Sequence, residues 1–272
     1  MEQLGISALH PRAPEIFSYV ALFSAPIDLD RVLEQLNALW GLDISGRWQQ
    51  VPAGENHPAG SILDFTWQGV HVAMSPVNIP LTLEKAQLPE HVFQVPVTLY
   101  APAKEAAAGE LANESAFLTQ IPEIRRRKRM LSAHFAATQL ADALMREAAA
   151  VGIFRSEMGI VQPPQMVTEL SGLLRAGKIP LPLWINIRTQ EIDLSWGRTY
   201  GLPLFGHLDM EIRETPKSAS AVYQILAEIA NYLISGESYL LPGQTLESGG
   251  EKMAITEEVS PVDKQTVIRI LT

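Results

Sequence analysis

The sequence contains no cysteine, which excludes disulfides, thiolate nucleophiles and cysteine-ligated zinc. It also has no run close to the roughly 18 apolar residues that a membrane-spanning helix needs. The first 15 residues lack both the basic stretch and the apolar stretch of a cleaved signal peptide. We therefore expect a cytoplasmic protein that does not bind membranes.

Positive charge is scarce as well, because 21 Lys and Arg residues oppose 30 acids and give a net charge of −9. This excess of negative charge disfavours general binding to nucleic acids or anionic membranes. Hydrophobic residues make up 47% and charged residues 19% of the chain, which are ordinary proportions for a globular protein. A chain of 272 residues is long enough to bury a large core.

Five of the few cations are consecutive, near the start of a helix that we predict from Pro122 to about Ala150. This basic cluster consists of Arg125, Arg126, Arg127, Lys128 and Arg129. Successive helical residues are rotated by about 100°, so the five cannot share one flat surface, and their place opposes the helix dipole. Three interpretations stay open: a solvated surface, contact with an acidic protein or with this chain's own acidic residues 191–272, and binding of phosphate or nucleic acid.

Local patterns predict the secondary structure. Strands are expected at 16–24, 46–51, 61–77 with a hairpin turn at Gln68-Gly69, 91–102, 151–162, 181–189 as a buried strand, 208–212 and 266–271. Pro96 places the strand at 91–102 toward a sheet edge. Helices are expected at 28–41, 104–118 on the surface, 122–150 with Leu131, Phe135, Thr138, Ala141 and Met145 on its apolar side, 163–177 and 218–236.

These elements predict an α+β fold with mainly antiparallel sheets and helices packed on one face. Strand–helix–strand order recurs at 16–80, 92–162 and 182–271, which raises the hypothesis of repeated β-α-β-β units. We divide the chain into an N-terminal β-α-β-β unit at 1–100, a helical segment with the basic cluster at 101–150, and a C-terminal α+β module at 151–272.

The C-terminal part has a recognisable pattern: LPLWINIRT, then TYGLPLFGHLDMEI, an amphipathic helix, and LLPGQTLESGGEKMAITEEVSP. Over roughly 182–272 this pattern resembles the bacterial domain-of-unknown-function family 4261. The shared motif T-x-G-L-x-x-F-G corresponds to Thr199, Gly201, Leu202, Phe205 and Gly206. The resemblance implies an α+β fold but no reaction and no catalytic residues, and the basic cluster is not part of it.

The physical properties of the motif favour a bulged corner that leads into the next strand. Gly201 and Gly206 permit positive φ or a close backbone approach, and Pro203 fixes one torsion between them. His207 and Asp209 alternate on that strand and are a conceivable pair of metal ligands, but a third ligand is missing from the pattern. We therefore interpret the motif as structural.

Other chemical motifs are incomplete. Residues 172–178 spell G-x-x-x-x-G-K, but Ile179 replaces the Ser or Thr that a phosphate-binding loop uses for magnesium. No G-x-S-x-G elbow and no H-x-x-x-H or H-E-x-x-H pair occurs. The sequence thus nominates no catalytic residue and no cofactor.

Three functional hypotheses follow. The first is a non-enzymatic bacterial protein that binds another protein, with toxin neutralisation or a secretion-associated accessory role as settings. The second is an enzyme or small-ligand binder whose site is assembled from distant residues of the C-terminal module, namely Arg188, Trp196, Tyr200, His207 and Asp209. The third, nucleic-acid binding through the basic cluster, opposes the net charge. A homodimer is compatible with each.

Overall fold

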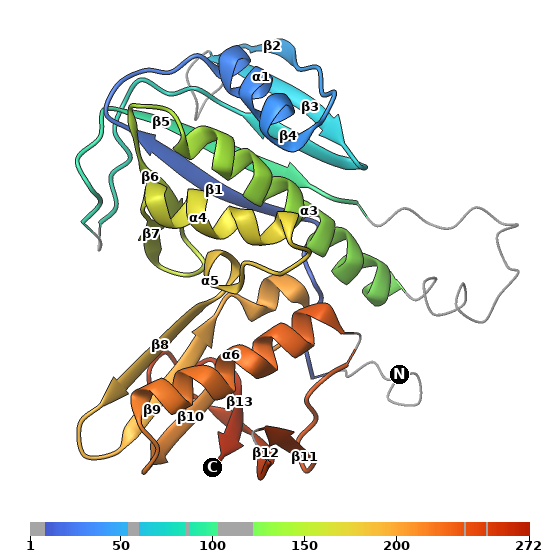
Figure 1. Ribbon diagram of the computed structural model, residues 1–272, viewed down its shortest axis with the longest axis vertical. Coiled ribbons are helices and arrows are strands. Elements are labelled where there is room, and N and C mark those ends of the chain that lie inside the picture. Colours follow the sequence, from blue (N-terminus) through green and yellow to red (C-terminus); the bar gives the residue numbers. More distant parts are fainter. Residues whose placement is uncertain (1–8, 54–59, 85–86, 103–121, 237, 249) are drawn as a thin grey trace, which may run out of the picture. The chain divides into compact units, whose positions relative to one another are not determined.

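The computed structural model describes residues 9–53, 60–84, 87–102, 122–236, 238–248 and 250–272. The surface helix predicted at 104–118 lies outside these residues. The chain forms two compact units, each containing residues from distant parts of the sequence (Figure 1). Unit 1 comprises the described residues of Met1–Pro14, Glu105–Lys128 and Trp184–Thr272, and unit 2 those of Glu15–Lys104 and Arg129–Leu183.

Unit 2 is built on a seven-stranded sheet with the order β2-β3-β4-β5-β1-β6-β7. Its strands are β1 (Ile16–Phe23), β2 (Arg47–Val51), β3 (Gly60–Trp67), β4 (Val70–Met74), β5 (Phe93–Tyr100), β6 (Ala150–Arg155) and β7 (Ile160–Gln162). All neighbouring strands pair antiparallel. The predicted hairpin turn joins β3 to β4, with positive φ at Gln68 and Gly69.

Helices cover one face of this sheet (Figure 1). They are α1 (Leu29–Trp40), α3 (Pro122–Met145), whose first turns belong to unit 1, and α4 (Pro164–Arg175). Asp28 caps α1 by accepting hydrogen bonds from two backbone N–H groups, and Gly41 ends it in the left-handed conformation. Alternate strand residues such as Phe17, Tyr19 and Ala21 are buried on the helix side.

Two details of unit 2 differ from the prediction. β5 lies in the middle of the sheet, between β4 and β1, and not at an edge. Pro96 is tolerated there because β4 ends at Met74, which pairs with Val97. Pro96 therefore lies opposite Ser75, just beyond the end of β4, and its carbonyl oxygen accepts a hydrogen bond from Ser75 N. The other difference is in α3, which ends at Met145 and turns Met130, His134 and Ala137 inward, whereas Leu131 and Phe135 stay half-buried.

Unit 1 contains a six-stranded sheet with the order β11-β12-β13-β10-β9-β8. Its strands are β8 (Asn186–Glu191), β9 (Ser195–Tyr200), β10 (Met210–Thr215), β11 (Thr245–Ser248), β12 (Glu251–Val259) and β13 (Thr266–Leu271). β10 and β13 are parallel, and the other pairs are antiparallel. Helix α6 (Ala219–Ser235) packs Val222 and Leu226 onto one face, beside Gly197.

The buried strand predicted at 181–189 is wrong in two respects. Its first half is a short helix, α5 (Leu181–Trp184), and β8 begins only at Asn186. β8 is also an edge strand with mostly exposed or half-buried side chains. The apolar residues Leu183, Trp184 and Ile185 that favoured a buried strand are indeed buried, but in the turn that precedes β8.

The motif that the sequence assigns to a corner connects β9 to β10. Leu202–Phe205 form one turn of 3₁₀ helix, with Leu202 and Phe205 buried. Gly201 and Gly206 flank this turn with φ of 115° and 76°, values that disfavour any side chain. Phe205 stacks on Trp184 at a centroid distance of 5.9 Å.

Two mostly antiparallel sheets with packed helices confirm the predicted α+β class. The strand–helix–strand segments at 16–80 and 92–162 share the sheet of unit 2, and β6 and β7 belong to it although they lie in the predicted module 151–272. The three-part division of the chain remains a prediction. Within the described ranges, no helix has the length and apolar character needed to cross a membrane.

Candidate functional site

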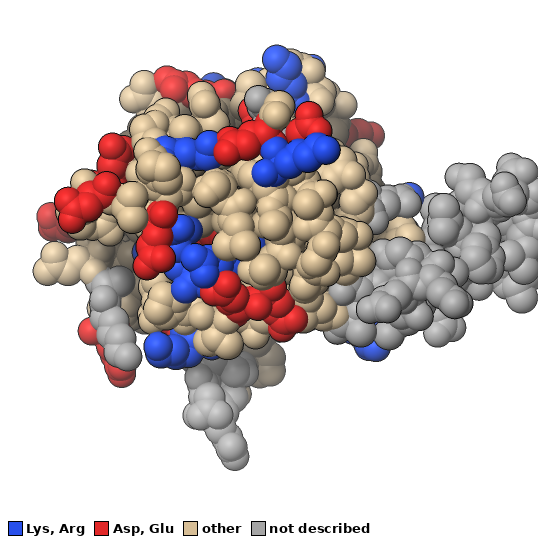
Figure 2. Space-filling model, turned by 90° about the horizontal axis from the view of Figure 1, so that it is seen from below, with Lys and Arg blue, Asp and Glu red and all other residues tan. Residues whose placement is uncertain are grey.

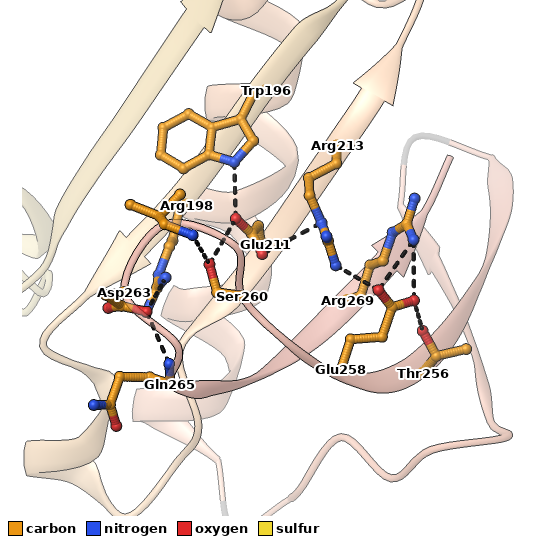
Figure 3. Close-up of polar contacts among 11 residues, drawn as sticks. Trp196, Arg198, Glu211, Arg213, Thr256, Glu258, Ser260, Asp263, Gln265 and Arg269 are labelled. Atoms are coloured by element: carbon orange, nitrogen blue, oxygen red, sulfur yellow. Dashed lines mark hydrogen bonds and ion pairs between the residues drawn. The ribbon is translucent and has the colours of Figure 1, made fainter.

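The most elaborate group of polar side chains lies on the face of the unit 1 sheet opposite α6. We call it the charged sheet face (Figure 3). It consists of Arg188, Trp196, Arg198, Tyr200, Glu211, Arg213, Thr256, Glu258, Ser260, Asp263 and Arg269. Strand register creates it, because Arg188, Arg198, Glu211, Arg269 and Thr256 are successive cross-strand partners on five neighbouring strands.

Local alternation explains why these side chains share a face. In β10 the polar residues Glu211 and Arg213 alternate with Met210 and Ile212, which are fully buried. In β9, Trp196 and Arg198 lie on either side of Gly197, whose Cα faces α6. One face of the sheet therefore supplies the core, and the other supplies charge.

Glu211 is fully buried at the centre of this face. Its Oε1 accepts hydrogen bonds from Trp196 Nε1 at 2.8 Å and from Ser260 Oγ at 3.2 Å, and its Oε2 lies 3.4 Å from Arg213 Nε. Burial of a carboxylate is costly unless charge and hydrogen bonds compensate it. Glu211 thus fixes Trp196, Ser260 and Arg213 around itself.

Arg198 and Asp263 form a second anchor beside it. Arg198 is only 2% exposed, and its two terminal nitrogens donate to the two oxygens of Asp263 at 2.8 and 2.7 Å. Such paired hydrogen bonds combine strength with fixed geometry. Desolvation opposes ionisation of Asp263, but the hydrogen bonds from Arg198 and from Gln265 N together with the charge of Arg198 outweigh it and lower the pKa of Asp263.

Arg213 and Arg269 converge on Glu258. Arg213 donates to Glu258 Oε2 at 2.5 Å, and Arg269 donates to both oxygens at 3.0 and 3.1 Å. Desolvation opposes ionisation of Glu258, but the hydrogen bonds and charges of Arg269 and Arg213 together outweigh it and lower the pKa of Glu258. These contacts hold Arg213 and Arg269 in place while parts of both side chains remain exposed to solvent.

Tyr200 completes the face between two guanidinium groups. The guanidinium carbons of Arg188 and Arg198 lie 4.8 and 5.1 Å from the centre of its ring. Partial burial raises the pKa of Tyr200, against the opposing effect of both arginines. Tyr200 therefore presents a neutral hydroxyl group at physiological pH.

The five residues of the small-ligand hypothesis occupy three separate places. Arg188, Trp196 and Tyr200 belong to the charged sheet face. Asp209 lies at the corner, where its Oδ1 accepts from Thr199 Oγ1 at 3.0 Å and Leu202 N at 3.3 Å. Burial raises the pKa of Asp209 to about 7 despite these hydrogen bonds.

His207 belongs to what we call the buried arginine site, with His10, Arg127 and Tyr239. Arg127, from the basic cluster, is only 8% exposed, and its NH2 lies 2.5 Å from His207 Nε2. It also donates to the carbonyl oxygens of Phe205, Leu233 and Gly236. The ring of Tyr239 lies 4.8 Å from its guanidinium carbon.

The two histidines at this site are neutral. Arginine only donates, so His207 Nε2 accepts and the His207 proton resides on Nδ1. Burial, together with Arg127 and His10, lowers the pKa of His207 to about 2. His10 accepts from Leu208 N and donates to Leu240 O, and burial lowers its pKa too.

The basic cluster is thus not a uniform surface. Arg127 lies inside unit 1, and Arg129 donates to Gln68 O at 3.4 Å within unit 2. Arg125 and Arg126 are half-buried, and Lys128 is exposed. Among the described residues, no group of three or more His, Asp or Glu side chains is arranged to hold a metal ion.

Sequence reasoning missed Glu211, Arg213, Glu258, Asp263 and Arg269. A usable signal was present, since E-I-R in β10 and I-R-I in β13 place charges at alternate positions between buried aliphatic residues. The sequence also contained a signal for the burial of Arg127. Arg127 lies three residues from Ile124 and from Met130, on the buried side of α3.

No curated protein and no solved structure matches this chain. The corner, the charged sheet face except Arg188 and Trp196, and helix α6 all lie within residues 198–271. Residues 198–271 match the model of a domain of unknown function, DUF4261, which confirms the resemblance inferred from the sequence over this C-terminal region.

Proposed function

We propose that this protein binds another protein and that the charged sheet face of unit 1 is its contact surface. The observation that carries the proposal is the set of Arg188, Trp196 and Tyr200 on one partly exposed sheet face, backed by the buried Glu211 and by the Arg198–Asp263 pair. Arginine, tryptophan and tyrosine are the residue types that dominate binding energy at protein interfaces.

The internal contacts of this face support recognition by a rigid surface. Glu211 and Asp263 fix Trp196 and Arg198 before any partner arrives, which reduces the entropy that association costs. Val262, which is 58% exposed, lies next to Asp263 in the β12–β13 turn and adds apolar contact area. Toxin neutralisation and a secretion-associated role are two settings in which such binding would operate.

Small-ligand chemistry has less support. Its five candidate residues make separate contacts, with Trp196 bound to Glu211, His207 to Arg127 and Asp209 to Thr199. A reacting group would need several of these side chains around a common point. We therefore advance only the binding function.

A comparison of matched variants tests the proposal. The wild-type chain, Arg188→Glu and Arg31→Glu serve as baits in lysate of the native host at about 150 mM salt, where the Debye length is about 8 Å. Arg31 is an exposed residue of α1 in unit 2, so its variant makes the same charge change at a residue that is not part of the charged sheet face. We expect a protein recovered by wild type and Arg31→Glu and lost with Arg188→Glu. The same recovery with all three baits, or no protein with any, contradicts the proposal.

A further inference from the structure

The seven-stranded sheet of unit 2 has a second face, opposite its helices, with an unusual composition. An antiparallel sheet face exposed to water normally carries polar side chains. Here the positions on that face include Val20, Ile62, Ala73, Pro96, Phe154 and Val161, all of which are half-buried. We call this the open sheet face.

Strand register makes the apolar part of the face continuous. Val20 pairs with Pro96 on one side and with Phe154 on the other, and Phe154 pairs with Val161. This row crosses four neighbouring strands, β5, β1, β6 and β7. Ile16 and Tyr100, a further cross-strand pair, are 53% and 40% exposed. Contiguous apolar patches of this kind mark contact surfaces.

The open sheet face is also electrically neutral. Among the described residues of its strands, the charged side chains on this face are Arg47 and Asp64, which form an ion pair of 3.5 Å on β2 and β3. At the centre, Ser18 and Thr98 hydrogen-bond to each other across β1 and β5 at 3.1 Å. Two copies of such a face meet without like-charge repulsion, although each chain carries a net charge of −9.

We propose that this face packs against the same face of a second copy of the chain, as an isologous sheet-on-sheet dimer. Two twisted sheets can pack face to face about 10 Å apart. Seven strands about 4.8 Å apart and about 20 Å long give an area on the order of 600 Å². Because side chains project from the sheet, the accessible area of the face is larger than this and approaches the roughly 800 Å² that each partner buries in a standard interface.

This dimer is separate from the proposed binding function, since it uses unit 2 and leaves the charged sheet face of unit 1 out. The two proposals are therefore independent. Arg188→Glu alters binding of a partner protein without altering the dimer, and a substitution on the open sheet face alters the mass of the protein.

The mass in solution tests the dimer, measured for the full chain by sedimentation equilibrium at about 150 mM salt. We expect twice the chain mass for wild type and the single chain mass for Val20→Lys, which places a cation in the apolar row. Ala38→Lys, at an exposed position of α1 on the opposite side of the sheet, is the matched control and keeps the dimer. A monomeric wild type, or a dimeric and folded Val20→Lys, overturns the proposal.

A second measurement covers the case in which Val20→Lys does not fold. Since the chain has no cysteine, Ser18→Cys and Ala38→Cys each carry a single thiol. A short bismaleimide should link two chains through Cys at position 18 and not through Cys at position 38. Cross-linking at position 38 alone, or a monomer in which the thiol at position 18 is protected from reagent, shows another occupant of the face and rejects the dimer.

Discussion

The Arg127 guanidinium supplies hydrogen-bond donors to the C-terminal end of α6. The carbonyls of Leu233 and Gly236 have no intrahelical donor available, and both accept from Arg127 NH2 at 3.0 and 3.2 Å. A cation at this end of a helix also interacts favourably with the helix dipole. One side chain from α3 therefore ties α6 to the corner at Phe205 within unit 1.

Removing this guanidinium should destabilise unit 1. Arg127→Met keeps much of the side-chain length but leaves the carbonyls of Phe205, Leu233 and Gly236 and the ring of His207 without a donor. We expect the free energy of unfolding to fall by about 3 kcal/mol, measured by urea denaturation. Lys128→Met, one residue away and exposed, should change it by about 0.5 kcal/mol at most. Equal effects of the two variants would disprove this role for Arg127.

The same site predicts a dependence of stability on pH. The folded-state pKa of His207 is depressed to about 2 by burial beside Arg127, whereas the unfolded chain has a pKa near 6.5. Below about pH 6.5 the unfolded state binds a proton that the folded state does not, so stability falls as the pH falls. His10, whose pKa is also lowered, acts in the same direction. Asp209 acts oppositely, because burial raises its pKa to about 7.

A comparison of variants isolates the contribution of His207. Between pH 6.5 and 5, its neutral imidazole should cost wild type up to about 1.4 kcal/mol of unfolding free energy per pH unit. His207→Gln lacks this titration, so its stability should fall less steeply over that interval, while Asp209 and His10 contribute equally to both proteins. His71→Gln, at an exposed position of unit 2, is the control and should follow wild type. Parallel pH profiles for all three proteins would exclude the effect.

At the scale of elements, α6 approaches the unit 1 sheet closely at one residue of β9. A methyl group at Gly197 would lie 2.4 Å from Val222 Cγ1 and 3.1 Å from Leu226 Cδ1. Glycine is needed at this position for space. The same contact keeps Trp196 and Arg198 on the opposite face, so packing against α6 and the position of the charged sheet face depend on each other.

Alanine substitutions at two glycines should therefore have opposite effects. Gly197→Ala forces α6 away from β9 and should lower the free energy of unfolding by about 1–3 kcal/mol. Gly172→Ala in α4 meets no atom within 4 Å and should raise it by about 0.5–1 kcal/mol, because alanine favours helix. Urea denaturation of both variants provides the measurement. Tolerance of Gly197→Ala would show that α6 is not packed against β9 as described.

Individual elements were predictable where the signal is local. The cap at Asp28, the turn at Gln68-Gly69 and the amphipathic α6 follow from residues close together in sequence. The strand wrongly predicted at 181–189 shows the limit of local patterns. Leu183, Trp184 and Ile185 are buried as a strand would bury them, but they form a helical turn and a connection. Pro96 was misplaced because its tolerance depends on where β4 ends.

At the scale of the whole molecule, long-range partners decide what the sequence could not reveal. The burial of Arg127 depends on Phe205 and His207, which are 78 and 80 residues away, and that of Glu211 depends on Ser260, 49 residues away. The distribution of charge over the surface also depends on residues that are distant in sequence. Figure 2 shows basic side chains lying next to acidic ones over much of one view, so the net charge of −9 does not exclude local arginine clusters.

This distribution of charge predicts how the protein behaves toward nucleic acid. Arg127 is occupied inside unit 1 and Arg129 contacts Gln68 O, so the basic cluster offers fewer accessible cations than its sequence suggests. Non-specific binding needs several phosphate contacts, and the net charge of −9 opposes them. We expect wild type and a variant with Arg126→Ser and Lys128→Ser to give the same low fluorescence anisotropy with labelled duplex DNA and single-stranded RNA, at both about 50 and about 150 mM salt. A salt-dependent rise for wild type that the variant loses would restore the nucleic-acid hypothesis, because only the exposed part of the cluster differs between the two proteins.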